Sequence, residues 1–329
     1  MKRILFILTG CALMNNVRSQ DFHLSMYDAA PLFLNPSMTG VIEGDWRIHA
    51  QCRTQWRAVN FKPYNTALLS FDAPVGKWGF GAQIIEARAG VGNYNALQGT
   101  ANIAYTVPLS KNKAHNLSFG VQGGVTQKSV EYKLYTFGNQ YVTTNGGGFD
   151  QSLNSNETFA SQSIMLPVVN AGLMYYYAKQ QSKLNPFLGF SAFNLIEPKE
   201  TFFMANNKWP MRFYAHTGVR VNITETIYLL PKVLVMQQGN ATEQTFAVDG
   251  GFYFKHSQLY FLAGLIYRTK DASIVSLGAR KNSYIAKVSY DFNMSTLTPN
   301  SDGRGGLEIS FTYIHQKEKP KGHKICPRL

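Results

Sequence analysis

The chain has 329 residues, of which 45% are hydrophobic, 13% aromatic and only 16% charged, with a formal net charge of +13. An ordinary soluble domain carries about a quarter charged residues, and a mean hydropathy of −0.17 is too polar for a bundle of membrane helices. The mixture is typical of a transmembrane β-barrel, in which lipid-facing and lumen-facing residues alternate along each strand.

Residues 1–19 have the form of a secretory signal peptide. Lys2 and Arg3 precede a short apolar stretch, and the mature chain is predicted to begin near Gln20. An alternative is a lipobox that ends at Cys11 and would leave a lipid on that residue. Export argues against nucleic acid as the reason for the positive charge, and leaves outer-membrane lipid, polysaccharide or an acidic protein as partners.

Residues 20–45 form an N-terminal segment that is expected either to plug the barrel lumen or to lie in the periplasm. The barrel is predicted to begin at residue 46, where side chains start to alternate between the two faces of a strand. One face carries Trp46, Ile48, Ala50, Cys52, Thr54 and Trp56, and the other carries Arg47, His49, Gln51, Arg53, Gln55 and Arg57. Ten residue steps in a tilted strand cover roughly 25 Å of the bilayer normal. Trp46 and Trp56 are therefore predicted to lie in the two interfacial aromatic girdles, together with Trp78 at the start of another strand.

The alternation recurs along the chain and predicts an all-β fold, an antiparallel transmembrane β-barrel of about fourteen strands spanning residues 46–315. The segments are 46–57, 64–71, 78–88, 97–107, 117–128, 167–178, 186–195, 211–223, 227–237, 245–255, 259–269, 273–280, 284–292 and 307–315. An even number of strands is expected to place both termini on the periplasmic side of the outer membrane. The odd-numbered connections should then be surface loops, and residues 129–166, 196–210 and 293–306 are long enough, whereas residues 270–272 are not.

Cationic side chains gather on the predicted lumen wall and in a C-terminal tail. The lumen-facing set is Arg47, Arg53, Arg57, Arg212, Arg220, Lys255 and Lys287. These cations could form an anion-selective wall, or they could brace a wide lumen by pairing with Glu86, Asp249, Asp291 and Glu308. The basic tail, residues 316–329, is expected to be either a solvated end or a docking peptide for an acidic periplasmic partner.

No sequence pattern indicates a catalytic residue, a cofactor site or a metal site. The seven His residues show no H-x-x-x-H or H-E-x-x-H spacing, and the three Cys residues show no metal-ligand spacing. His49 and His216 lie on predicted lumen faces, so a hydrolase with a Ser–His pair is an alternative, but lumen His residues paired with neighbouring Gln, Asn or Tyr are favoured. Gly120, Gly123 and Gly124 favour a closely packed strand whose small residues make room for an inward loop.

Four short motifs resemble those of the PorP/SprF family, outer-membrane proteins associated with the type IX secretion system of Bacteroidetes. The first reads L-N-P-S-M-T-G and resembles the family's N-P-A-x-x-G, with Ser in place of Ala; the second is the pair Q-W. The third reads Y-D-F and then G-L-E-I-S, where the family has Y-D and G-S-H-E-I, and the fourth is the ending C-P-R-L. The matching positions are Asn35, Pro36, Gly40, Gln55, Trp56, Tyr290, Asp291, Glu308, Cys326, Pro327 and Arg328.

The resemblance implies a non-enzymatic barrel that helps to export, retain or display a large secreted surface protein, such as a gliding adhesin, with a type B C-terminal sorting domain. It also implies contacts with periplasmic or outer-membrane components of the type IX secretion and gliding machinery. The loops 129–166 and 196–210 would then face the exported protein, while the segment around Asn35 and the tail would face the periplasm. A passive porin or a channel for hydrophobic solutes is the alternative from another functional class.

Overall fold

The computed structural model describes residues 21–57, 62–179, 182–202, 207–296 and 298–316. The predicted signal peptide, the lipobox alternative at Cys11 and the motif positions Cys326, Pro327 and Arg328 lie outside these residues. No helix in the described part of the chain is long and apolar enough to cross a membrane.

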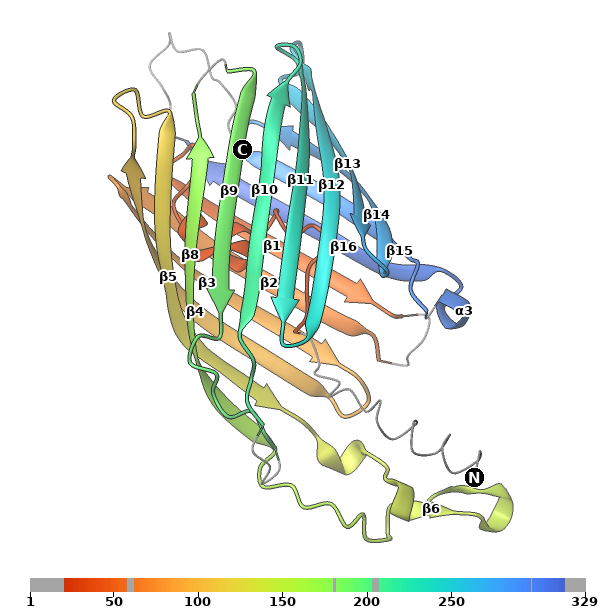
Figure 1. Cartoon of the computed structure of the whole chain (residues 1–329). Helices are drawn as coiled ribbons and strands as arrows, with labels where there is room; N and C mark the ends of the chain where they lie inside the picture. The colour runs from red at the N-terminus through yellow and green to blue at the C-terminus, as the bar shows by residue number, and fades with distance from the viewer. Residues whose placement is uncertain (1–20, 58–61, 180–181, 203–206, 297, 317–329) are drawn as a thin grey trace, which may run out of the picture.

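Fourteen antiparallel strands close into a barrel (Figure 1), which confirms the predicted fold class. In chain order they are β1 (Trp46–Gln55), β2 (Tyr64–Val75), β3 (Trp78–Ala89), β4 (Tyr94–Pro108), β5 (His115–Ser129), β8 (Ser163–Tyr177), β9 (Leu184–Phe193), β10 (Arg212–Asn222), β11 (Ile227–Gln238), β12 (Ala241–Phe254), β13 (Leu259–Arg268), β14 (Ala272–Lys281), β15 (Tyr284–Asn293) and β16 (Arg304–His315). Neighbours in this order pair, and β1 pairs with β16 to close the wall. Each of the fourteen predicted segments coincides with one strand, and no predicted end differs by more than four residues.

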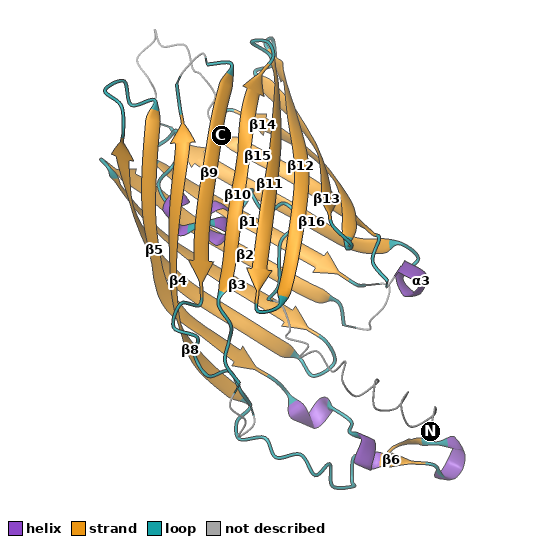
Figure 2. Cartoon of the chain, in the orientation of Figure 1, coloured by secondary structure: helices purple, strands orange, loops and turns teal. Residues whose placement is uncertain are grey.

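The connection between β5 and β8 contains short elements where the sequence indicated only a surface loop or a disordered insertion (Figure 2). They are η2 (Tyr132–Leu134), η3 (Gly138–Gln140), η4 (Thr144–Gly146) and a hairpin of β6 (Tyr141–Val142) and β7 (Gly148–Phe149). Ring contacts support them, since Tyr132 stacks on Phe159 with centroids 4.6 Å apart, and Tyr141 meets Phe149 edge to face. A further short helix, α3 (Thr298–Ser301), precedes β16.

Period-two alternation separates the two faces of the wall. Outward residues such as Phe71 and Leu265 remain 46% and 67% exposed, as expected of side chains that meet lipid. Inward residues such as His49, Gln51 and Glu308 are almost fully buried, although all three are polar. Buried polar side chains need hydrogen-bond partners, so something other than bulk water must fill this lumen.

The two ends of the barrel differ. The loop end holds the C-terminal ends of β1, β3, β5, β9, β11, β13 and β15, and the longest connections join strands there. The turn end holds the C-terminal ends of the other seven strands, and most of its connections are short turns. The connection 269–271 is a short link at the loop end, as the sequence already indicated.

Residues 21–45 lie inside the barrel and are called the plug below. The plug contains α2 (Pro31–Leu34) and η1 (Pro36–Met38), both of which are mostly buried. It begins at the loop end, where Asp21 contacts Gln238, and it ends at the turn end, where the Asp45 amide donates to the His315 carbonyl. Asp21 and the last described residue, Gln316, therefore lie at opposite ends of the barrel. The two termini lie outside the described residues, so their common periplasmic side stays a prediction.

Candidate functional site: a plugged lumen with a vestibule

The centre of the plug is held by one buried amide. Asn35 Nδ2 lies 3.1 Å from the Leu173 carbonyl, 3.2 Å from the Phe190 carbonyl and 3.1 Å from His216 Nε2, so it donates to acceptors on three strands of the wall. Its Oδ1 accepts from the amide and the hydroxyl of Ser37, which turns the chain into η1. A single Asn side chain thus fixes both the position of the plug and its local fold.

Glycines lie in the wall where the middle of the plug approaches it most closely. A methyl group added at Gly120 would overlap Pro36 and Ser37, one at Gly172 would overlap the Asn35 side chain, and one at Gly79 would overlap the Thr39 carbonyl. Plug atoms, either backbone or the Asn35 side chain, occupy the space that a larger side chain would take at these three positions. The interpretation that Gly120 makes room for an inward segment is therefore confirmed.

The turn end of the plug is tied to the wall by Gly40. Its φ of +73° lies in the left-handed region that favours glycine, and its amide donates to Asp72 Oδ2 over 2.7 Å. Arg47 binds the same carboxylate through two hydrogen bonds of 2.8 Å. Asp72 is fully buried, so this bidentate pair neutralises a charge that water does not reach.

Nearer the loop end, two carboxylates from the last two strands hold the plug backbone. Glu308 accepts from the amides of Ser25 and Met26 over 2.7 and 2.8 Å, and Asp291 accepts from the Ser25 hydroxyl over 2.6 Å. Arg53 completes the cluster, because its Nη2 lies 2.7 Å from Asp291 and its Nε 3.4 Å from Glu308. Residues near opposite ends of the sequence thus meet at one point of the lumen.

Arg268 continues this cluster toward the rim. It contacts Glu243 at 3.5 Å and Asp271 at 2.6 Å, and it donates to His23 Nε2 over 2.7 Å. Burial lowers the pKa of His23 well below its ordinary value, and the nearby guanidinium groups of Arg268 and Arg53 lower it further. The imidazole is therefore neutral and accepts the hydrogen bond from Arg268 without charge repulsion.

A second charged cluster lies between the two ends of the plug. Lys232 lies 2.5 Å from Asp28 of the plug and 2.6 Å from Asp249 of the wall, and Lys287 lies 3.6 Å from Asp249. Burial alone would raise the pKa of Asp28, but the Lys232 ammonium outweighs it and holds the pKa below its ordinary value. Asp28 is therefore ionised at neutral pH.

The predicted lumen cations mostly take part in these contacts. Arg47, Arg53 and Arg212 are buried and paired with carboxylates, and Asp21 is the partner of Arg212 at 3.3 Å. Arg220 packs its guanidinium 3.9 Å from the ring centre of Tyr228. The pairing of lumen cations with Asp249, Asp291 and Glu308 favours the bracing interpretation over an anion-selective wall.

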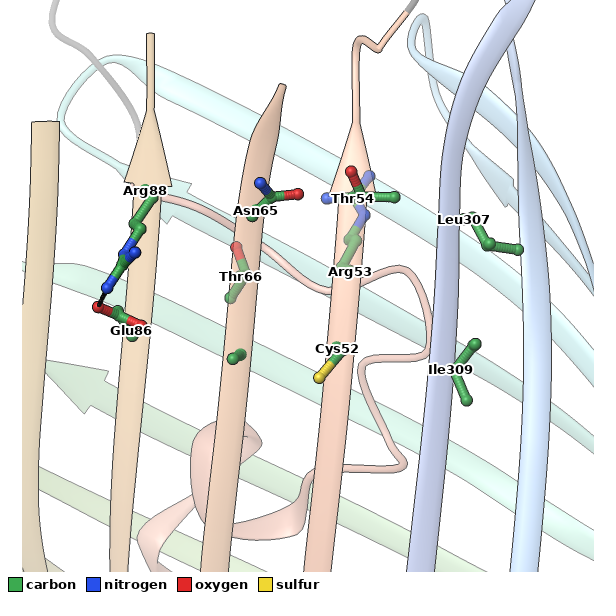
Figure 3. A pocket seen from close by; sticks show the side chains of 10 residues that line it. Cys52, Arg53, Thr54, Asn65, Thr66, Glu86, Arg88, Leu307 and Ile309 are labelled. Atoms are coloured by element: carbon green, nitrogen blue, oxygen red, sulfur yellow. Dashed lines mark hydrogen bonds and ion pairs between the residues drawn. The ribbon is translucent and has the colours of Figure 1, made fainter. Parts of the chain in front are cut away.

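Three other members of that prediction lie elsewhere. Arg57 lies past the end of β1 and is exposed, and Lys255 forms an exposed pair with Glu225. Glu86 does not face the lumen; it lies on the outward side of β3, where it pairs with Arg88 at 2.6 Å (Figure 3). The pair lines a hollow of about 250 Å³ on the outer surface of the wall.

The three predicted girdle tryptophans divide between the two ends. Trp46 contacts Tyr313 and stacks on His315, and Trp78 meets Tyr105, so both belong to an aromatic ring at the turn end. Trp56 lies beyond β1 with a φ of 60°, which breaks the alternation, and it lines a cavity at the loop end. Trp56 therefore does not continue the outward row that Trp46 begins.

That cavity, called the vestibule below, occupies about 1280 Å³ between the start of the plug and the loop-end rim. Aromatic, amide and charged side chains line it, including Trp56, Tyr64, Tyr94, Gln98, Lys128 and Trp209. The motif residue Gln55 and the buried Arg53 and Asp291 also face it. The vestibule is larger than most small-molecule sites, which are about 300–1,000 Å³, and it is not uniformly apolar.

The lumen histidines are satisfied by neutral partners. His49 Nδ1 contacts Thr312 and its Nε2 contacts Gln51, and His216 Nε2 is the acceptor for Asn35. These contacts match the favoured interpretation of paired lumen histidines. Within the described residues, no group of three or more His, Cys, Asp or Glu side chains could hold a metal ion.

Several charged residues of the site were missed by the sequence reasoning, among them Asp28, Asp72, Lys232, Glu243 and Arg268. Lys232 and Arg268 sit on inward rows of segments that were predicted as strands, so a charge on a lumen row was the available signal. Asp72 was assigned to a turn, because the predicted strand ended at residue 71, whereas β2 continues to Val75. Asp28 lies in the plug, where no periodicity orients a side chain.

The motif positions, in contrast, largely converge on this site. Asn35, Pro36 and Gly40 form the seated half of the plug, Asp291 and Glu308 hold its other half, and Gln55 and Trp56 line the vestibule. Tyr290 is the exception, since it faces outward and contacts Phe292.

Comparison with known proteins agrees with this architecture. Residues 16–313 match the model of a family described as type IX secretion system membrane protein PorP/SprF. The comparison with curated proteins finds no match. The solved structure of the Ralstonia pickettii toluene transporter TbuX aligns with 88% of this chain and 94% of its own at 9% identity and a TM-score of 0.51. A TodX deltaS2S3 mutant monoaromatic hydrocarbon channel aligns with 85% of this chain and 92% of its own at 11% identity and a TM-score of 0.50. At identities this low, the alignments show a shared barrel fold alone.

Proposed function

The chain belongs to the PorP/SprF family of type IX secretion system membrane proteins, and from that premise we propose that it is a non-enzymatic barrel that binds one large exported protein. The exported protein would carry a type B C-terminal sorting domain, and the barrel would assist its export or its retention at the surface. Binding, rather than conduction or catalysis, is the activity assigned to the barrel.

The observation that carries this proposal is the plug. It crosses the lumen from Asp21 to Asp45 and contacts strands all around the wall. A conduit needs a continuous water-filled path, whereas a plugged barrel offers a rigid rim and a vestibule. A vestibule with mixed aromatic, amide and charged walls suits a segment of polypeptide better than a single small solute.

We infer the orientation from the asymmetry of the two ends. Barrels of the outer membrane have short periplasmic turns and longer extracellular loops, which supports an orientation with the loop end outside and Gln316 on the periplasmic side. The vestibule and the 130–162 connection would then face an exported protein, while the chain beyond Gln316 would face the periplasmic secretion and gliding components. Asp21, at the loop end, would be reached from outside.

Deletion of the gene tests the function. The mutant should keep an intact outer membrane but lose one large adhesin from its surface, and a surface proteome of mutant and parent measures this loss. Identical surface proteomes would contradict the proposal. Complementation with the wild-type gene is the control.

A channel for hydrophobic solutes is the second candidate, favoured by the aromatic residues that line the vestibule. The aligned structures include a toluene transporter and a monoaromatic hydrocarbon channel, but that likeness extends to the fold alone. Uptake of radiolabelled toluene into vesicles, together with current across planar bilayers, separates the two functions. Uptake or steady current in the wild-type protein supports the channel, and a silent barrel supports binding.

A further inference from the structure

Ion pairs inside the lumen form clusters, and in the described part of the chain all but one of these clusters balance their charges. The balanced clusters are Arg47 with Asp72, Arg212 with Asp21, Lys128 with Glu200, and Lys232 and Lys287 with Asp28 and Asp249. The exception is the network around Arg53 and Arg268. It borders the vestibule through His23, Arg53, Glu243, Asp271 and Asp291, which are called the floor below.

The network around these two guanidinium groups contains four carboxylates. They are Asp291 and Glu308, which contact Arg53, and Glu243 and Asp271, which contact Arg268. The Asp271 side chain is 42% exposed and reaches water, but none of the other three carboxylate side chains is more than 12% exposed. Three buried carboxylates against two cations leave at least one buried negative charge without a counter-charge among the described residues.

His23, the other titratable group of the floor, does not supply the missing positive charge. Arg268 Nη1 lies 2.7 Å from His23 Nε2, and a guanidinium group only donates hydrogen bonds. His23 Nε2 is therefore the acceptor, so the ring carries one proton and is neutral. Water can complete a hydrogen bond at this place, but a buried negative charge is stabilised far more by a cation beside it.

Two carboxylates of the floor also have acceptor positions that the chain does not use. Asp291 is 3% exposed, its Oδ2 is paired, and its Oδ1 has no hydrogen-bond partner among the described residues. Glu243 lies 3.5 Å from Arg268 Nε and 3.6 Å from His23 Nδ1, which is longer than the roughly 2.7–2.9 Å of a charge-assisted hydrogen bond. The floor therefore lacks donors as well as positive charge.

The vestibule above the floor indicates which kind of cation fits. It occupies about 1280 Å³, which is far more than a metal ion needs, and no group of three or more His, Cys, Asp or Glu in the described part of the chain could hold one. Aromatic and amide side chains line its walls, and the Lys128 ammonium already lies 3.8 Å from the centre of the Trp209 ring. Such walls suit the apolar stem and the charged head of a basic side chain. A cation carried by a polypeptide therefore fits the vestibule better than a free metal ion.

We propose that the floor of the vestibule binds a lysine or arginine side chain of the exported protein, beside Glu243, Asp271 and Asp291. This inference rests on the proposed function and names the chemistry that the barrel recognises in its cargo. The bound side chain supplies the counter-charge that the network lacks, and its N–H groups donate to carboxylate oxygens that are unpaired or loosely paired in the barrel alone.

The first test measures charge selectivity with two small probes. Acetyl-arginine amide and acetyl-citrulline amide have similar shapes, but only the first is charged, and Trp56 and Trp209 in the vestibule report binding by fluorescence. In nanodiscs of zwitterionic lipid, the full-length barrel should bind the arginine amide about tenfold more tightly than the citrulline amide, and Glu243→Gln should abolish this preference. Equal binding of the two probes to the wild-type barrel would overturn the site.

The stability of Glu243→Gln separates a binding role from a bracing role. If Glu243 carries uncompensated charge, its neutral variant should be at least as stable as wild type in urea titrations. A clear loss of stability would show that Glu243 braces Arg268 and would overturn the argument from charge. Glu225→Gln is the matched control, because Glu225 pairs with Lys255 at the exposed turn end and far from the floor; it should keep the preference for the arginine amide.

The second test uses the purified C-terminal sorting domains of the large secreted proteins that the same genome encodes. The double variant Glu243→Gln, Asp271→Asn should bind the recognised domain about tenfold more weakly than wild type, and the arginine amide should compete with that domain. Wild-type affinity in the double variant would overturn the floor as the contact and leave the proposed function standing. Failure of every domain to bind the wild-type barrel would count against the proposed function, whereas a preference for the arginine amide would still support a cation site at the floor.

Discussion

The two halves of the plug are held by different physics. Residues 35–38 are seated by neutral hydrogen bonds to wall carbonyls and by glycine gaps, and Gly40 is tied to the Asp72 carboxylate at the end of this seat. Residues 21–28 are held mainly by ionised side chains. Shape complementarity fails when atoms are added, and buried ion pairs fail when one partner is removed. The turn-end half is thus a fixed seat, and the loop-end half is a clamp that depends on charge.

The largest effect is expected from breaking the clamp at Glu308. Glu308→Ala leaves Arg53 buried beside Asp291 alone and leaves the amides of Ser25 and Met26 without an acceptor. The expected cost is about 3–5 kcal/mol of unfolding free energy, measured by urea titration in lipid vesicles. Hydrogen exchange should accelerate at Ser25 and Met26.

Glu308→Gln is the matched control, because its amide oxygen still accepts from the plug and its cost should be smaller. Exchange at Ser37 should stay slow in both variants, since that residue is held by Asn35 and not by the clamp. Equal acceleration along the whole plug would show that the two halves act as one unit and would contradict the comparison.

The next effect is expected from filling the seat. Gly120→Val places side-chain atoms where Pro36 and Ser37 lie, and overpacking of this kind costs about 1–3 kcal/mol. The middle of the plug should lift away from the wall, and planar bilayers should show a current that the wild-type barrel lacks. Gly123→Val is the control on the same strand, because nothing lies within 4 Å of a methyl group added there. A silent Gly120→Val barrel would mean that the seat is not what closes the lumen.

The sequence predicted much of the barrel wall but little of the plug. The period-two rows located most of the fourteen strands, because lipid on one side and a polar lumen on the other impose a pattern along each strand. The segments 186–195 and 227–237 are apolar on both faces, so their register was not predicted. Gly120 was named as a gap only together with Gly123 and Gly124, of which Gly123 meets nothing and Gly124 meets the neighbouring strand, so the sequence did not tell the lumen row from the outward row there. The plug lacks any period, so the sequence left open whether residues 20–45 enter the lumen at all.

The sequence also did not predict which side chains pair with one another inside the lumen. Arg53 and Glu308 are register partners in adjacent strands, but closure of β1 onto β16 decides that, and no local pattern reports it. Asp28 and Lys232 meet only because the plug passes Lys232. The family resemblance marked Asn35, Asp291 and Glu308 without saying what they contact; the structure shows that all three hold the plug.

A smaller loss of stability is expected at Gly40, at the end of the seat, where comparison with Gly76 separates backbone strain from contact with the wall. Gly40 and Gly76 both have positive φ, but a methyl group added at Gly40 would lie 2.7 Å from the Gly79 Cα, whereas nothing lies within 4 Å of one added at Gly76. Gly76→Ala should cost about 1 kcal/mol from backbone strain alone. Gly40→Ala should cost about 1 kcal/mol more, measured by the same urea titration. Equal costs would show that the Gly40 contact with the wall contributes nothing to the seat.

The smallest effect is expected from titrating the clamp at Asp28. Lys232 lowers the pKa of Asp28 to about 2 against the burial that would raise it, so ionised Asp28 stabilises the folded barrel at neutral pH. That contribution is present above the unfolded-state pKa of roughly 4 and is lost as the pH falls toward 2. Because the Asp28 side chain is 26% exposed, the contribution is of the order of 1 kcal/mol. Asp28→Asn should therefore lower the unfolding free energy at pH 7 and converge with wild type near pH 2. If the unfolding free energies of the two proteins differ by the same amount at every pH in this range, ionised Asp28 does not stabilise the folded barrel. The clamp then consists of Glu308 and Asp291 alone.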